Sequence, residues 1–96
     1  MKLFLVHCGF YDSSLNAGTV EGHTNFWVAA ATASEARARA KGLAEFRRRK
    51  MHVDVVQEIR AVEGFEVILK PRAELNGKTL ISLQKYGSPR AKLVEL

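Results

Sequence analysis

The pattern of apolar and polar positions predicts three strands in the first two-thirds of the chain. Residues 2–8, KLFLVHC, are apolar at nearly every position, as in a short strand buried on both faces. Residues 23–31 and residues 52–62 instead alternate between two kinds of side chain, which is typical of strands with one buried face.

Residues 32–50, TASEARARAKGLAEFRRRK, have the spacing of a single long helix. Thr32 and Glu35 fit a capping box, in which the threonine hydroxyl accepts the amide three residues on and the glutamate reaches back. Alanine at several positions of the apolar stripe predicts that this helix lies close to the surface it covers. Gly42 is the weak point of the pattern, because glycine inside a helix costs up to about 1 kcal/mol relative to alanine.

The last third of the chain holds turn signals and shorter apolar runs. Glu63-Gly64 predicts a tight turn into a fourth strand at residues 65–69, since glycine adopts the positive φ that such turns need. Asn76-Gly77 is a second turn signal, and a fifth strand is expected after it. The tail from residue 88 onward matches no pattern clearly.

These elements predict one α+β domain over residues 1–96, in the order β-β-α-β-β(-β). The second and third strands are joined by the helix, and such a crossover makes two strands of one sheet parallel. We therefore expect a mixed sheet with one long helix packed on one face. If the first strand pairs antiparallel with the second, its end lies beside the starts of the other two.

That topology brings three histidines and two acidic residues to one end of the sheet. They are His7, Glu21, His23, His52 and Asp54. Imidazole and carboxylate groups suit zinc or another divalent metal, and a neutral histidine near an aspartate also suits acid–base chemistry. We interpret the five as a candidate small-ligand site, with His23, His52 and Asp54 as candidate metal ligands. The alternative is that the histidines are solvated or capping residues with local hydrogen bonds.

Cys8 follows His7 directly, but adjacent residues of a strand point to opposite faces. The two side chains therefore cannot form a nucleophile–base pair with each other. Cys8 shares a face with Phe4 and Val6, and we expect it to be buried under the helix as a small apolar residue. A single cysteine also makes no internal disulfide.

The face opposite the helix is predicted to carry apolar side chains that need cover. They are Leu3, Leu5, Trp27 and Val56. An exposed apolar patch usually marks an interface. The cover is expected to be either the C-terminal segment folding back or, most simply, a second copy of the chain in a homodimer.

The chain is basic, with a net charge of +5 and a pI of about 9.7. Seven of its fifteen basic residues lie between Arg37 and Lys50, which makes the RRRK run at residues 47–50 a candidate nucleic-acid contact. The members of this run are Arg47, Arg48, Arg49 and Lys50. The alternative is a solvated helix end, where the helix dipole favours cations. No nucleic-acid-binding motif accompanies the run.

Composition and sequence motifs limit the expected location and class of function. No apolar stretch approaches the roughly 20 residues that span a bilayer, and the first residues lack a small-residue cleavage site. We therefore expect a cytoplasmic protein without a membrane partner. No nucleophile-elbow or phosphate-loop motif appears, so a non-enzymatic, homo-oligomeric binding module is the first hypothesis. A small hydrolase-like or metal-dependent enzyme that uses the same histidines and acids is the alternative, and nucleic-acid binding is a further one.

Three stretches resemble the domain of unknown function 1543 family of bacterial proteins. They are KLFLVHCGF, EGHTNFWVAA and MHVDVVQEIRAVEGFEVIL, and they cover about residues 2–69, whereas residues 70–96 add a further strand or tail. The residues that match the family pattern are Gly9, Glu21, His23, His52, Asp54 and Gly64. The chain departs from that pattern at Phe10, at Thr24 and at Glu63-Gly64-Phe65. The resemblance implies the architecture and a functional interest in the matching histidines and acids, but it implies no activity.

Overall fold

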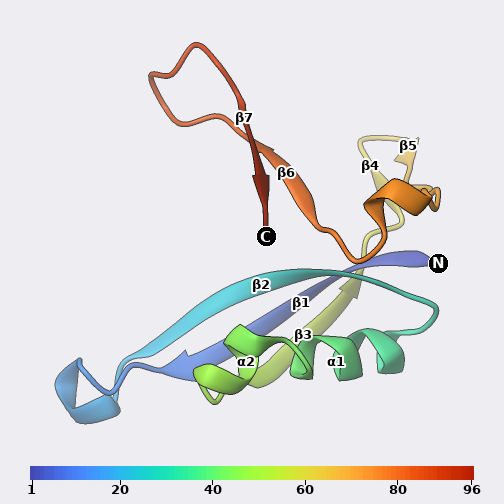
Figure 1. Ribbon diagram of the computed structural model, residues 1–96. Helices are drawn as coiled ribbons and strands as arrows, with labels where there is room; N and C mark the ends of the chain where they lie inside the picture. The colour runs from blue at the N-terminus through green and yellow to red at the C-terminus, as the bar shows by residue number, and fades with distance from the viewer.

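The computed structural model describes all 96 residues as a three-stranded sheet, two short α-helices on one face of it and a long C-terminal extension (Figure 1). In chain order the elements are β1 (Lys2–Tyr11), the 3-10 turn η1 (Asn16–Gly18), β2 (Glu21–Ala30), α1 (Ala33–Lys41), α2 (Ala44–Arg48), β3 (His52–Glu58), β4 (Ala61–Val62), β5 (Phe65–Glu66), the 3-10 turn η2 (Ala73–Leu75), β6 (Leu80–Leu83) and β7 (Lys92–Glu95). Residues 1–60 are called the body and residues 61–96 the arm. No helix is both long and apolar enough to cross a bilayer.

The sheet of the body has the strand order β2-β1-β3, and β1 is antiparallel to both neighbours. The α+β class is confirmed, and β2 and β3 run in the same direction as the crossover requires. The prediction of a mixed sheet is wrong, because β1 lies between the two parallel strands and every adjacent pair is antiparallel. The prediction that β1 is buried on both faces is wrong, because Phe4, Val6 and Cys8 are buried under the helices whereas Leu3 and Leu5 on the other face are only partly buried.

The single long helix is also corrected. The chain forms α1 and α2, and between them Leu43 has extended dihedral angles, with φ −69° and ψ 142°. Gly42 ends α1 because its small helix propensity does not hold the chain in the helix beyond that point. The threonine half of the capping box is confirmed, since the Thr32 hydroxyl accepts the Glu35 amide at 3.1 Å. The Glu35 carboxylate also reaches back, but it accepts the amide of Ala31, one residue before the N-cap, at 3.3 Å.

The core lies between the sheet and the two helices. Its buried side chains are Phe4, Val6, Cys8, Val28, Ala30, Ala36, Ala40, Phe46 and Met51. Ala36 and Ala40 are fully buried, so small side chains do bring α1 close to the sheet. The predicted burial of Cys8 beside Phe4 and Val6 is confirmed.

A β-bulge changes the alternation along β3. Cys8 pairs with Val53 and His7 pairs with Val55, so Asp54 is an extra residue between the two pairs. Residues directly opposite each other share a face, and Val55 therefore lies with His7 on the face away from the helices. The prediction that Val56 lies on that open face is wrong. The bulge turns Val56 toward the core, where it packs beside Val6.

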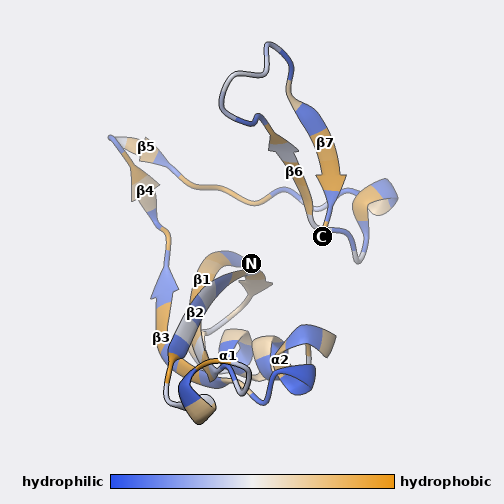
Figure 2. Ribbon diagram, turned by 90° about the vertical axis from the view of Figure 1, so that its left-hand side faces the viewer, coloured by the Kyte–Doolittle hydropathy of each residue, from blue (hydrophilic) through white to orange (hydrophobic).

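The arm contains two hairpins that extend from the body on the side opposite the helices (Figure 1). The Glu63-Gly64 turn is confirmed, with φ of 49° and 88°, but the fourth strand is only Phe65–Glu66. The fifth strand is β6, and it pairs with β7 from the tail that the sequence pattern left open. No residue of the arm is buried, although hydrophobic stretches run along it (Figure 2).

Candidate metal-binding site

The predicted site residues lie at one end of the open sheet face. Glu21 and His23 begin β2, His52 and Asp54 begin β3, and Gly9 lies between the two strands near the end of β1. Gly9 pairs with His23 on one side and with His52 on the other. The antiparallel pairing of β1 with both neighbours thus brings together residues that are more than thirty positions apart in the sequence.

Glu21, His23, His52 and Asp54 form a closed ring of contacts, which we call the quartet. His23 Nε2 lies 3.0 Å from Glu21 Oε1 and 3.3 Å from Asp54 Oδ2. His52 Nε2 lies 3.2 Å from Glu21 Oε1 and 3.2 Å from Asp54 Oδ1. Each imidazole nitrogen therefore faces both carboxylates, and each carboxylate faces both rings.

His7 adjoins the quartet and does not belong to its ring of contacts. Its ring stacks on that of His23 with a centroid separation of 5.0 Å and an angle of 5° between the planes. His7 Nδ1 lies 2.8 Å from the side-chain oxygen of Asn25, which fixes the ring orientation. Two sets of three donors are each close enough to share one ion: one is His7, His23 and Asp54, and the other is Glu21, His52 and Asp54. Asp54 belongs to both sets, whereas His23 and His52 belong to different ones.

Gly9 is the floor of the site. A Cβ atom at this position would lie 2.6 Å from Glu21 Oε1 and 2.6 Å from His52 Nε2, and real Cβ atoms do not approach other atoms so closely. The missing side chain therefore leaves room for the glutamate and the imidazole to meet above the central strand. Sequence reasoning treated Gly9 only as part of a resemblance, although a glycine inside a strand signals a close approach.

The quartet is polar and half-exposed, and its carboxylates have no lysine or arginine beside them. The exposed fraction is 33% for the Glu21 and Asp54 side chains and 41–43% for the two imidazoles. Neither carboxylate forms an ion pair with a lysine or an arginine. With both rings neutral, the four side chains carry a net charge of −2 that the chain itself does not balance.

Two further residues support the site and were not predicted. Asn25 holds His7, and the alternation along β2 that places His23 on the open face places Asn25 there too. Tyr11 follows on β1 with its ring centroid 6.1 Å from that of His52. The spacing of Tyr11 from His7 and Gly9 in the strand gives it the same face.

Cys8 lies on the other side of the sheet from the histidines. Its Sγ is buried in the core and contacts the Val6 carbonyl oxygen at 3.8 Å. Burial raises the pKa of the thiol, the negative charge of Asp54 raises it further, and Arg37 offsets part of the increase. A thiol with a raised pKa and no imidazole partner is not an activated nucleophile.

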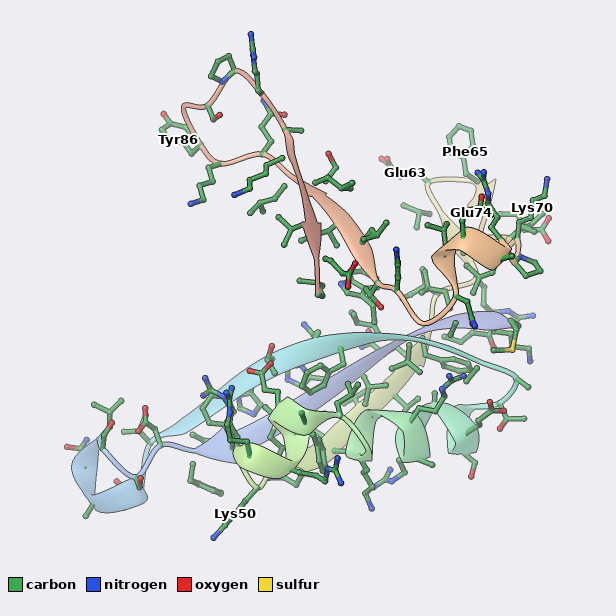
Figure 3. All side chains as sticks on the ribbon, in the orientation of Figure 1. Lys50, Glu63, Phe65, Lys70, Glu74 and Tyr86 are labelled. Atoms are coloured by element: carbon green, nitrogen blue, oxygen red, sulfur yellow. The ribbon has the colours of Figure 1, made fainter.

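The basic run lies at the end of α2, where Arg48, Arg49 and Lys50 line a hollow together with residues 10–13 at the end of β1. The Arg49 guanidinium lies 4.6 Å from the centre of the Phe10 ring and pairs with Glu45 at 3.3 Å. Arg47 and Arg48 are exposed in the last turn of the helix, and Lys50 points away from the sheet (Figure 3). Arg49 thus has partners within the chain, and nucleic-acid binding by this run stays a prediction.

Comparison with known proteins returned no match to a family model, a curated protein or a solved structure. The resemblance to the domain of unknown function 1543 family, which rests on the motifs quoted above, therefore stays a prediction. The quartet consists of four of those motif residues.

Proposed function

We propose that the protein is a binding module for a divalent transition metal ion, with Glu21, His23, His52 and Asp54 as the ligands. The observation that carries the proposal is the ring of four contacts in which two imidazole nitrogens and two carboxylates converge. Imidazole and carboxylate donors together favour zinc and its neighbours over the hard cations calcium and magnesium, which prefer oxygen ligands alone.

The spacing of the donors supports a tetrahedral ion. Zinc bonds to histidine and carboxylate are about 2.0–2.2 Å long, so neighbouring donors of a tetrahedral site lie about 3.3 Å apart. The nitrogen–oxygen separations in the quartet are 3.0, 3.2, 3.2 and 3.3 Å. The donors that are close enough to share one ion form two sets of three with Asp54 in common, so a four-ligand site would require the His23 and His52 side chains to move toward each other.

Electrostatics supports the same proposal. Two carboxylates converge with no lysine or arginine to balance them, and a divalent ion would cancel the charge that remains when the rings are neutral. The four protein donors would fill a tetrahedral shell and leave no position for a substrate. Binding, with a structural or sensing role, therefore fits better than metal-dependent catalysis.

The proposal includes kinship with the domain of unknown function 1543 family. All four ligands are residues in which this chain resembles the family pattern, and Gly9 below them is a fifth. Under this proposal, these five residues match the family pattern because the four ligands and the glycine below them form the metal site.

The test is a titration of chelator-treated protein with Zn²⁺ by calorimetry and with Co²⁺ by visible absorption. We expect one ion per chain, a dissociation constant of about 1 μM or lower, and the intense d–d bands of tetrahedral Co²⁺. Asp54→Asn removes one donor and should weaken binding by about tenfold or more.

The matched control is Glu58→Gln. Glu58 is on the same strand and its side chain is 31% exposed, but it contacts Lys2 and Arg60 and lies outside the quartet. This variant should bind the metal like the unmodified chain. Absence of Zn²⁺ binding, or equal binding by the Asp54→Asn variant, would show that the quartet is only a set of surface ion pairs.

A further inference from the structure

The chain has two apolar surfaces without a partner. The first is the open face of the sheet, defined by Leu3, Leu5, Trp27 and Val55. Trp27 is 49% exposed and Val55 is 43% exposed, although both are in the middle of strands. No helix covers this face, because α1 and α2 both pack on the other one (Figure 1).

The second surface is the arm. Its most exposed apolar residues outside the loop at Tyr86 are Val62, Phe65, Ile68, Leu93 and Leu96, with exposed fractions from 54% to 78%. Figure 3 shows Phe65 at the tip of the first hairpin, pointing away from the sheet. Isolated two-stranded hairpins are marginally stable in water, so the arm needs a surface on which to pack.

The chain exposes more surface than a compact protein of its mass. By the usual scaling of surface with mass, a compact protein of 10.7 kDa exposes about 5,500 Å², whereas this chain exposes 7710 Å². The surplus of about 2,200 Å² is more than the roughly 800 Å² that each partner contributes to a standard interface. The radius of gyration, 15.6 Å, likewise exceeds the value of about 12.5 Å for a compact domain of this length.

We propose that the arm of one chain covers the open face of a second copy, and that the exchange is reciprocal about a two-fold axis. Each chain has one open face and one arm, so a two-fold exchange gives both surfaces a partner and leaves none over. The chain's own arm meets the body beside the edge strand β2, where Thr79 and Leu96 line a hollow with Trp27. Phe65 and Ile68 remain exposed in that position.

The exchange would also define the surroundings of the quartet. His7 follows Leu5 on the same face of β1, and His23 and Trp27 share the face of β2. An arm packed over Leu5 and Trp27 would therefore end beside the quartet, which would lie at the rim of the interface.

Complementation between two variants tests the exchange. Trp27→Lys disables the open face and keeps the arm, whereas Phe65→Asp with Ile68→Asp disables the arm and keeps the face. In sedimentation equilibrium we expect the unmodified chain to be a dimer, and each variant alone to dissociate about tenfold or more readily. Mixing the two variants should restore a heterodimer, because one intact arm then meets one intact face.

Leu15→Lys is the control, because Leu15 is as exposed as Trp27, at 49%, but lies in the loop before η1. This variant should dimerise normally, and circular dichroism should show that all the variants are folded. A monomeric unmodified chain would overturn the proposal. A mixture that stays monomeric would also overturn it, since the arm would then pack on its own body.

The unmodified chain allows a second test that needs no substitution. If the arm packs on another copy, amide hydrogen exchange in β6 and β7 should slow as the protein concentration is raised. Exchange in β1, which is the central strand of the body, should depend less on concentration. Exchange in the arm that is the same at all concentrations would contradict the proposal.

Discussion

The body and the arm have nearly the same apolar content and opposite degrees of packing. Hydrophobic residues make up 29 of the 60 residues of the body and 16 of the 36 residues of the arm. All ten buried residues lie in the body, between Phe4 and Met51. Apolar content alone therefore does not produce a core, and the difference must come from how the elements are connected.

The connections of the body close a layer. The helix segment between β2 and β3 returns over the sheet, and β1 between those strands presents Phe4, Val6 and Cys8 to it. The arm has no such third layer. Its strands pair only within their own hairpins, and β4 and β5 contribute two residues each. The arm meets the body only beside β2, and an element with so little surface to pack on cannot bury its apolar side, whatever its composition.

A matched pair of truncations should show the largest difference between the two regions. Phe4→Ala opens a cavity at a residue that is 2% exposed, and should lower the free energy of unfolding by about 3–5 kcal/mol. Phe65→Ala, at a residue that is 78% exposed, should lower it by less than about 0.5 kcal/mol in dilute protein. Urea denaturation followed by circular dichroism measures both. Equal losses in dilute protein would mean that the arm packs on its own body.

Thiol reactivity should separate the regions next. Cys8 is fully buried, so a thiol reagent reaches it only after the body opens. In a Cys8→Ala background, Tyr86→Cys places a thiol at a fully exposed position of the arm. We expect Cys8 to react at least about 100-fold more slowly than the exposed thiol at position 86. That ratio corresponds to a free energy of opening of about 2.7 kcal/mol or more. Similar rates would contradict the rigid core of the body.

The sequence predicted those features that depend on local pattern. The alternation along β2 placed His23 and Trp27 on one face and Phe26 on the other, as the structure does. The capping box and the Glu63-Gly64 turn follow from backbone chemistry within four residues. The convergence of the quartet residues needed only the antiparallel pairing of β1 and β2 and the direction of the crossover.

What the pattern missed depends on tertiary packing. The bulge at Asp54 adds one residue to β3, and no local signal distinguishes it from regular alternation. It moved Val56 into the core and Val55 to the open face. The helical spacing predicts no break at Leu43, and Phe46 reaches the core from a second helix rather than from the end of a single one. The sequence of the arm has the composition of ordinary strands. Its packing is limited because each of its strands pairs only within its own hairpin, which the composition does not reveal.

Gly9→Ala should have a smaller effect on stability and a specific effect on the site. The added methyl group meets the partly exposed ends of the Glu21 and His52 side chains at 2.6 Å, and these ends can move aside, so we expect a change in stability within about 1 kcal/mol together with loss of Zn²⁺ binding. Gly87 in the arm has open space around it but a φ of 82°. Gly87→Ala should cost about 1 kcal/mol or slightly more and leave metal binding unchanged. Calorimetric titration and thermal unfolding of both variants make the comparison, and retained binding in Gly9→Ala would place the ion elsewhere.

The smallest expected effect is the dependence of stability on alkaline pH. Burial, with a contribution from Asp54, raises the pKa of the Cys8 thiol in the folded chain above its value in the unfolded chain. Below the ordinary thiol pKa of about 8.5 the group is neutral in both states and has no effect. As the pH rises through that value the unfolded chain loses the proton first, so the free energy of unfolding falls.

The difference between the unmodified chain and Cys8→Ala, measured by urea denaturation from pH 7 to 10, isolates this effect from the titration of other groups. The arm contains no cysteine, so truncations in the arm should leave this difference unchanged. A difference between the two chains that does not vary with pH would show that the thiol is solvated in the folded state.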